Sequence, residues 1–105
     1  MITIEQVAQY IGIDYYQDDA MVTANLQRAA NSAPYRLHSS VGEGVEEAFP
    51  DDPRIEELLL MYAEESYDNR VGNAKQDAAK RHLRDLYEDQ LRLELRRARA
   101  GGGGS

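Results

Sequence analysis

Apolar residues at helical spacing between positions 55 and 67 are the feature that most limits what this chain can fold into. They recur three and four residues apart, which places them on one face of an amphipathic helix. The face carries Ile55, Leu58, Leu59, Tyr62, Ser66 and Tyr67. Asp52-Pro53 marks its start, because proline is favoured at the first helical position after a capping residue. We expect this helix to run to about Asn69.

A short helix is predicted at the beginning of the chain. Thr3 and Gln6 have the spacing of a capping box, and the apolar pattern that begins at Ile4 stops at Gly12. Asp18 or Asp19 can then cap a second helix. The second helix has an apolar, alanine-rich face made of Val22, Leu26, Ala29, Ala30 and Ala33.

Pro34 lies inside the pattern of this second helix. Proline removes a backbone donor and clashes with the preceding turn. We therefore expect the second helix to kink or to be interrupted near Ala33, with Tyr35 and Leu37 continuing it. Residues 39–52 contain Gly42, five acids and no sustained period, so they are predicted to form a loop, near the length at which loops are functional or disordered.

A long fourth helix is predicted after a break at Gly72 and Asn73, from Ala74 or Lys75 to about Ala98. Its steps of four and three follow Ala79, Leu83, Leu86, Gln90 and Leu93, and Tyr87, Leu91 and Leu95 widen the stripe. A helix of about 24 residues is roughly 36 Å long, more than a domain of this size is wide. We therefore expect part of it to project.

The predicted fold is thus all-α, a small bundle of four helices with a long, partly projecting C-terminal helix. Residues 1–74 would form the body and residues 75–100 the long charged helix. Residues 101–105 read Gly-Gly-Gly-Gly-Ser and are expected to be a flexible tail, either an artificial linker or a natural glycine tail.

Composition limits the class of protein. At 105 residues without cysteine, the chain is expected to form one domain held by packing alone, with no disulfide or thiolate site. No segment approaches the roughly 20 apolar residues of a membrane span, and the N-terminus lacks the pattern of a signal peptide. We therefore expect a soluble, unexported protein that folds in the cytoplasm and has no membrane contact.

Charge is divided unevenly along the chain. Residues 1–74 hold 14 acids and four bases, net −10, and residues 75–105 hold five acids and eight bases, net +3, which together give −7. An acidic body with a basic end can pair head to tail with its own copies. The alternative is a solvated acidic surface with a basic helix end favoured by the helix dipole. Either way, the acidic body argues against tight binding to DNA.

Sites for chemistry are weak. His38 and His82 have no further His or Cys at ligand spacing, so no metal or cofactor is expected. The adjacent Glu pairs point about 100° apart on a helix and are better explained as solvated faces than as catalytic carboxylates. We expect no catalytic residue and no enzyme.

Contact residues are the more plausible sites. Either Arg70 interacts with the last carbonyls of the third helix and Tyr67 is left half-buried, or Asp68 and Arg70 fix that helix against the second helix or a neighbouring subunit. On the fourth helix, cations could meet an acidic partner. The candidate interaction residues are Tyr67, Asp68, Arg70, Arg84, Arg92, Arg96 and Arg97.

An ordered set of features spans roughly residues 1–72: Thr3-Ile-Glu-Gln-Val-Ala-Gln-Tyr-Ile11, the acidic turn with Ile13-Asp14 and Asp18-Asp19, the helix with Arg28-Ala-Ala30 and Ala33, a variable loop, and Tyr67-Asp-Asn-Arg70. In this order the features resemble the head-tail connector proteins of long-tailed bacteriophages. The chain departs from that family after Gly72, where many relatives are expected to have a shorter and more apolar ending.

The resemblance implies a structural virion protein without catalytic residues. Such a subunit would form a homo-oligomeric ring of about a dozen copies, dock on the portal protein and receive a tail-side completion or tail terminator protein. DNA would pass through its channel without specific binding. It would be assembled in the host cytoplasm and located at the head-tail interface. The alternative is a small helical regulatory or partner-binding module that uses its fourth helix as an interaction arm.

Overall fold

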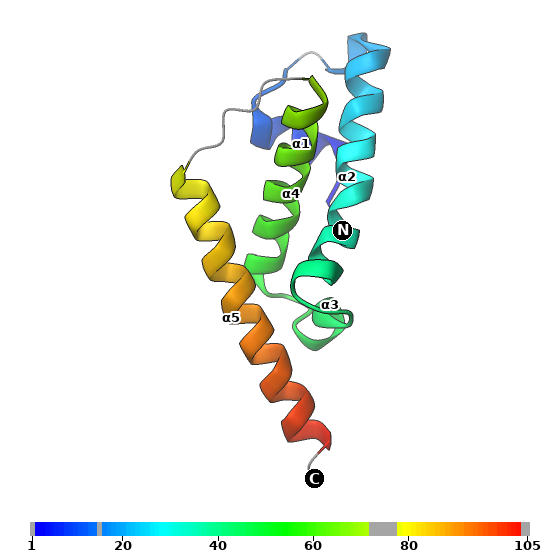
Figure 1. The fold of residues 1–105 in the computed structure, drawn as a ribbon. Helices are drawn as coiled ribbons and strands as arrows, with labels where there is room; N and C mark the ends of the chain where they lie inside the picture. The colour runs from blue at the N-terminus through cyan, green and yellow to red at the C-terminus, as the bar shows by residue number, and fades with distance from the viewer. Residues whose placement is uncertain (1, 15, 72–77, 104–105) are drawn as a thin grey trace.

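The computed structural model describes residues 2–14, 16–71 and 78–103, with side chains of residues 68–71 and 102–103 outside the description. Its elements are α1 (Ile4–Ile11), the 3-10 turn η1 (Tyr16–Asp18), α2 (Ala20–Ser40), α3 (Val45–Ala48), α4 (Pro53–Val71) and α5 (Ala78–Gly103). No strand occurs among the described residues, so the predicted all-α fold is confirmed. Figure 1 shows α4 in the middle, with α2 and α5 on either side and α1 behind.

Local signals set the first two helices as predicted. Thr3 and Gln6 form the capping box of α1, and Gly12 ends it in the left-handed conformation at φ 94°. The Asp19 carboxylate caps α2 by accepting hydrogen bonds from the amides of Met21 and Val22. These caps satisfy backbone donors that a helix end leaves without partners.

Pro34 does not interrupt α2, which runs from Ala20 to Ser40. The predicted continuation through Leu37 is therefore confirmed, and the interruption near Ala33 is wrong. Packing accounts for the continuity, because the buried face of α2 extends to both sides of Pro34 and lies against α4. Burial of that face offsets a proline penalty of about 3 kcal/mol. The face consists of Leu26, Ala29, Ala30, Ala33 and Leu37.

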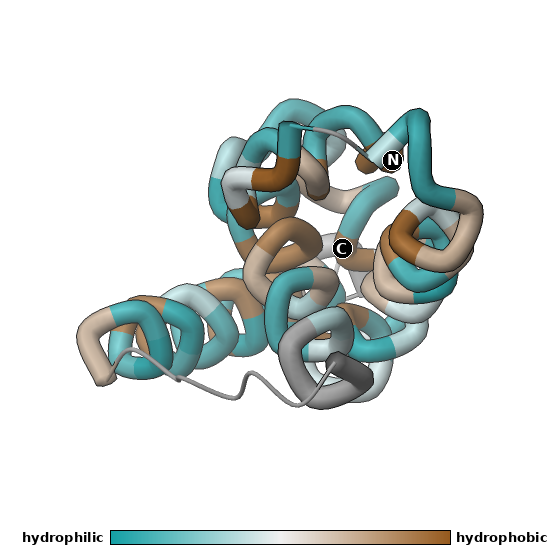
Figure 2. Tube along the Cα trace, turned by 90° about the horizontal axis from the view of Figure 1, so that it is seen from above, coloured by the Kyte–Doolittle hydropathy of each residue, from teal (hydrophilic) through white to brown (hydrophobic). Residues whose placement is uncertain are grey.

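The central helix α4 begins where the sequence predicts. The Asp52 carboxylate accepts a hydrogen bond from the amide of Arg54, directly after Pro53. The helix continues to Val71, beyond the expected end near Asn69. Hydrophobic positions concentrate where the helices face one another, as seen from above in Figure 2. The core side chains of α4 are Ile55, Leu58, Leu59, Met61, Tyr62 and Ala63.

The predicted loop between α2 and α4 is partly helical. Ser39 and Ser40 belong to α2, and Val45–Ala48 forms α3. Val45 is fully buried and Val41 nearly so, because α5 covers this segment. Gly42 has φ 143°, and a Cβ there would lie 2.9 Å from Leu95 Cδ2. The prediction missed α3 because its burial depends on a helix about 50 residues away in sequence.

The last helix, α5, lies along α4 and continues past the body (Figure 1). Its 26 residues span about 39 Å, and the protein measures 54 × 25 × 18 Å. The predicted start near Ala74 or Lys75 lies outside the described residues. The end lies at Gly103 instead of near Ala98, so the helix includes Gly101 and the two glycines after it. Each added residue continues an existing helix, which needs no new nucleus.

Candidate interaction surface on α5

A buried tyrosine anchors α5 to the body. Tyr62 of α4 is fully buried, and its phenol donates a 2.6 Å hydrogen bond to Oε2 of Glu88 on α5. Burial, followed by the contact with Glu88, raises the pKa of Tyr62 well above its ordinary value. Leu91 and Leu95 pack on the same side of α5 and are buried with it. The face of α5 that meets the body is therefore the one that carries Glu88, Leu91 and Leu95.

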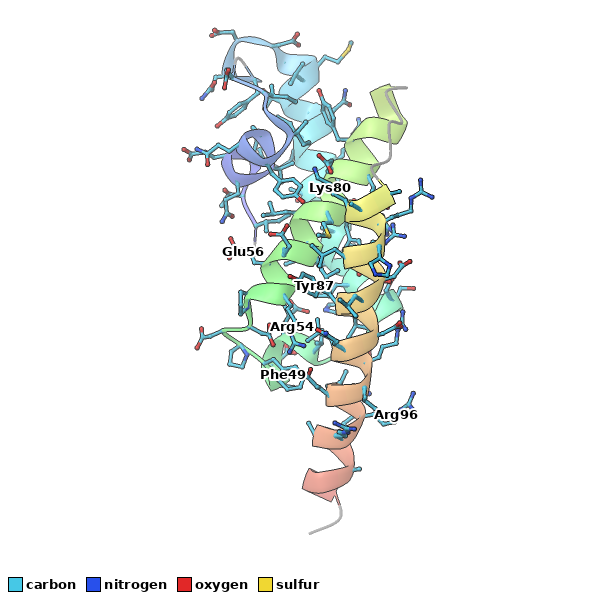
Figure 3. The ribbon with its side chains drawn as sticks, turned by 90° about the vertical axis from the view of Figure 1, so that its left-hand side faces the viewer. Phe49, Arg54, Glu56, Lys80, Tyr87 and Arg96 are labelled. Atoms are coloured by element: carbon cyan, nitrogen blue, oxygen red, sulfur yellow. The ribbon has the colours of Figure 1, made fainter. Side chains whose placement is uncertain are left out.

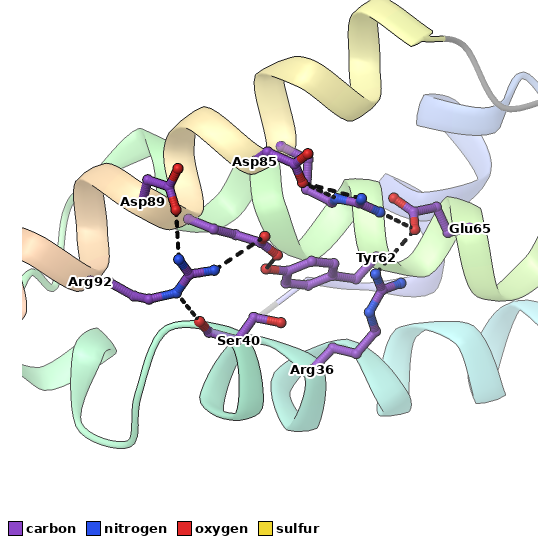
Figure 4. A network of polar contacts seen from close by, with 9 residues as sticks. Arg36, Ser40, Tyr62, Glu65, Asp85, Asp89 and Arg92 are labelled. Atoms are coloured by element: carbon purple, nitrogen blue, oxygen red, sulfur yellow. Dashed lines mark hydrogen bonds and ion pairs between the residues drawn. The ribbon is translucent and has the colours of Figure 1, made fainter.

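A second contact joins three helices through one carboxylate. Glu65 Oε1 on α4 accepts hydrogen bonds from Arg84 of α5 at 2.6 Å and from Arg36 of α2 at 3.1 Å. The Arg36 guanidinium also lies 4.6 Å from the centroid of the Tyr62 ring, within cation-π range. Figure 4 shows these residues as one network between α2, α4 and α5. Its geometry fixes the rotation of α5 about its own axis.

Arg54 holds the start of α4 to α5. Its guanidinium makes a bidentate pair with Glu94 at 2.7 and 2.8 Å and a 2.6 Å contact with Asp52. These hydrogen bonds raise the pKa of Arg54, first through Glu94 and then through Asp52. The same contacts lower the pKa of both carboxylates. Bidentate arginine pairs are among the stronger ionic contacts in proteins.

Two further arginines of α5 bind backbone oxygens at the end of α2 and in the turn that follows it. Arg92 donates to the carbonyl of Ser40 and also meets Asp89 at 2.6 Å. Arg99 donates to the carbonyl of Glu43. These contacts place α3 and its flanking turns under the C-terminal half of α5.

The predicted interaction residues therefore divide into two groups. Arg84 and Arg92 make contacts within the protein, with Glu65, Ser40 and Asp89 as partners. Both therefore have ion-pair partners within the protein.

The remaining predicted residues lie elsewhere. Tyr67 is half-buried and packs against the core, in agreement with its local role at the end of the third predicted helix. The side chains of Asp68 and Arg70 lie outside the described residues. Arg96 and Arg97 are exposed and form no ion pair with any described residue. Figure 3 shows Arg96 on the side of α5 opposite Arg54.

The outer side of α5 carries two leucines that belong to the apolar stripe predicted from the sequence. Leu86 is 43% exposed and Leu93 is 45% exposed, seven residues apart on one face. Gln90, which belongs to the same predicted stripe, is exposed and accepts a 3.2 Å hydrogen bond from Arg54. The predicted stripe therefore divides: Leu83, Tyr87, Leu91 and Leu95 are buried or pack on the core, whereas Leu86 and Leu93 are exposed. Leucines recur on both sides of α5, so spacing alone did not distinguish the two faces.

Sequence reasoning missed the contacts that orient α5. Arg54 was not singled out, although an arginine directly after a capping aspartate and proline is the signal that could have drawn attention to it. Glu88 was not singled out either, although it is 8% exposed and bonded to Tyr62. Lys80, also missed, joins Glu64 at 3.2 Å and lies 4.9 Å from the Tyr10 ring centroid.

This arrangement is suited to holding surfaces in place. Within residues 2–14, 16–71 and 78–103, no group of three or more His, Cys, Asp or Glu side chains could hold a metal ion. No helix in the same ranges has both the length and the apolar character needed to cross a membrane. The polar contacts described above fix α5 on the body and leave Leu86, Leu93, Arg96 and Arg97 accessible.

Comparison with known proteins gives no relative from which a function could be taken. No family model matches the chain, and no curated protein and no solved structure shows significant similarity to it.

Proposed function

We propose that this chain is a structural adaptor that forms a ring beneath a bacteriophage portal, joins capsid to tail and surrounds the channel through which DNA passes. The observation that carries the proposal is the ordered series of landmarks in residues 1–72, from the capped first helix to Tyr67-Asp68-Asn69-Arg70. The portal protein would contact one face of the ring, and a tail-side completion or tail terminator protein would contact the other. In this role the protein is not an enzyme.

Packing gives physical reasons for several of these landmarks. Ala29, Ala30 and Ala33 are buried between α2 and α4, where small side chains let two helices approach closely. Tyr67 packs against the same core. The landmarks therefore support a rigid helical body, which a subunit in a load-bearing ring requires.

Charge supports the same role. The net −10 of residues 1–74 would give the channel a negative wall, and a negative wall repels DNA and lets it move without sticking. Specific DNA binding is not part of the proposal. Duplex DNA that bound to the isolated ring at moderate salt would contradict the channel role.

The direct test is assembly in the presence of a portal. Purified protein is mixed with portal rings and studied by light scattering after size exclusion and by negative-stain microscopy. Rings, either spontaneous or formed only on the portal, are the expected result, because some adaptors assemble only on their partner. A protein that stays monomeric or dimeric and ignores every portal offered would reject the connector role.

The second candidate is a helical partner-binding module that uses α5 as its interaction arm. The exposure of Leu86 and Leu93 on the outer side of α5 favours it. Such a module would bind its partner as a monomer or dimer, without a ring. The assembly experiment above therefore distinguishes the two candidates.

A further inference from the structure

Beyond Leu95, the C-terminal end of α5 contacts the body through Arg99, which donates to the carbonyl of Glu43. Leu95 is the last buried residue of the helix, and all side chains of residues 96–101 are exposed. We call residues 96–103 the arm, which is about 12 Å long. Arg96 and Arg97 form no ion pair with the described residues, and Arg99 binds a carbonyl instead of a carboxylate. The arm therefore presents positive charge, and of its exposed cations Arg97 lies near one carboxylate, Glu94, whose pKa it helps Arg54 to lower.

An acidic groove lies elsewhere on the body, between the N-terminal segment with α1 and the start of α4. Its volume is about 450 Å³. Among the described residues, none that line it is Lys or Arg. Its polar and exposed lining includes Glu46, Asp51, Asp52, Glu56, Pro50 and Pro53.

Two of the four carboxylates in this groove, Asp51 and Glu56, form no ion pair with any described residue. Asp52 is paired with Arg54, but Glu56 accepts only from the neutral amide of Gln6 at 2.8 Å. Asp51 is exposed and forms no ion pair with the described residues, and Glu46 meets only His38. The groove thus needs cations that the rest of the body does not supply.

We propose that the arm of one copy of this chain binds in the acidic groove of a second copy. The guanidinium groups of Arg96 and Arg97 would pair with Asp51 and Glu56, and their aliphatic stems would cover the exposed prolines of the groove. Charge complementarity between two surfaces of one sequence identifies the partner as a second copy.

Among the described residues, no ion pair joins the arm to the groove of the same chain. Because α5 is one continuous helix, the arm extends in the direction that the buried residues of α5 set. Figure 3 shows Arg96 and Glu56 on opposite sides of the molecule. An arm-to-groove contact is heterologous, so its repetition closes a ring or extends a filament. The inference rests on the proposed ring function, since it names the contact between ring neighbours.

The absence of cysteine in the sequence permits a direct test. One chain carries Pro50→Cys at the groove and another carries Ala100→Cys on the arm, both replacing exposed residues. The two chains are mixed at high concentration and low salt, oxidised, and separated on non-reducing gels, with the linked peptides identified by mass spectrometry. We expect about fivefold more groove-to-arm product than groove-to-groove or arm-to-arm product.

Charge reversal supplies the control. Arg96→Glu with Arg97→Glu in the arm chain should lower the groove-to-arm yield roughly tenfold, and Asp51→Lys with Glu56→Lys in the groove chain should restore it. Arg81→Glu, an exposed cation at the other end of α5, should leave the yield unchanged. Equal yields of all three products, or a yield indifferent to reversal of the arm, would overturn the inference.

The outcomes also separate this inference from the proposed function. If the groove-to-arm product forms but no ring assembles on any portal, the arm-to-groove contact is supported and the connector function is rejected. If rings assemble on a portal but no groove-to-arm product forms, the connector function is supported and the arm-to-groove contact is rejected.

Discussion

The phenol of Tyr62 and the carboxylate of Glu88, 2.6 Å apart, are the buried polar link between α4 and α5. The link matters because Glu88 is a charged group with 8% exposure, and a buried charge needs a partner. Arg92 contributes a more distant contact at 3.7 Å. The position of α5 on the body therefore depends strongly on one hydroxyl group.

Tyr62→Phe should lower the free energy of unfolding by about 1.5–3 kcal/mol, the range for hydrogen bonds to charged groups. The ring and its packing are retained, so the loss reports the hydroxyl group. Chemical denaturation with circular dichroism measures it. Tyr10→Phe is the matched control, because Tyr10 makes a longer, 3.2 Å hydrogen bond to Glu57 in a half-buried site. A loss at Tyr62 no larger than the loss at Tyr10 would contradict the anchoring role.

Acid should weaken the protein through Asp52 and Glu94. Their folded-state pKa values are lowered by Arg54, so their contribution to stability is complete above the ordinary carboxyl pKa of about 4. That contribution is lost as the pH falls through the lowered values. Thermal unfolding between pH 6 and pH 2.5 should show this loss. In Arg54→Gln the loss of stability on acidification should be smaller. An unchanged pH profile would show that Arg54 does not stabilise the protein through Asp52 and Glu94.

Pro34→Ala should stabilise α2. Proline inside a helix is about 3 kcal/mol less favourable than alanine, whereas its smaller unfolded-state entropy returns about 0.4–1 kcal/mol. We expect a net gain of about 2–2.6 kcal/mol in urea unfolding. Pro53→Ala is the control, because the first helical position of α4 needs no amide donor. Equal effects at both prolines would mean that α2 gains no hydrogen bond.

The two sides of α5 should respond differently to truncation. Leu91→Ala removes a fully buried side chain and should lower the free energy of unfolding by about 2–5 kcal/mol. Leu86→Ala and Leu93→Ala, on the exposed side, should each lower it by less than about 1 kcal/mol. Denaturant titration of the three variants tests which face docks. A large decrease in the free energy of unfolding of Leu86→Ala would show that Leu86 lies in the core.

The sequence was sufficient where short-range chemistry sets the structure. Thr3 with Gln6, Gly12, Asp19 and Asp52-Pro53 mark helix ends through contacts a few residues apart, and the structure agrees at each of them.

Long-range contacts decided the rest. The docking face of α5 depends on pairs such as Tyr62 with Glu88 and Glu65 with Arg84, separated by 26 and 19 residues. Spacing could not identify it, because leucines occur on both faces. Val45 was assigned to a loop for a similar reason, since its burial is provided by α5. The sequence could therefore predict that the candidate arginines lie on a helix. It could not predict which of them form ion pairs within the protein and which do not.

The Tyr62 site also gives the protein an optical property. The chain has no tryptophan, so its near-ultraviolet emission comes from tyrosine alone. A tyrosine whose hydroxyl donates a hydrogen bond to a carboxylate fluoresces weakly, and Tyr62 donates such a bond to Glu88. Separation of α5 from α4 would therefore brighten the emission, and the protein would report the detachment of its own C-terminal helix without any added dye.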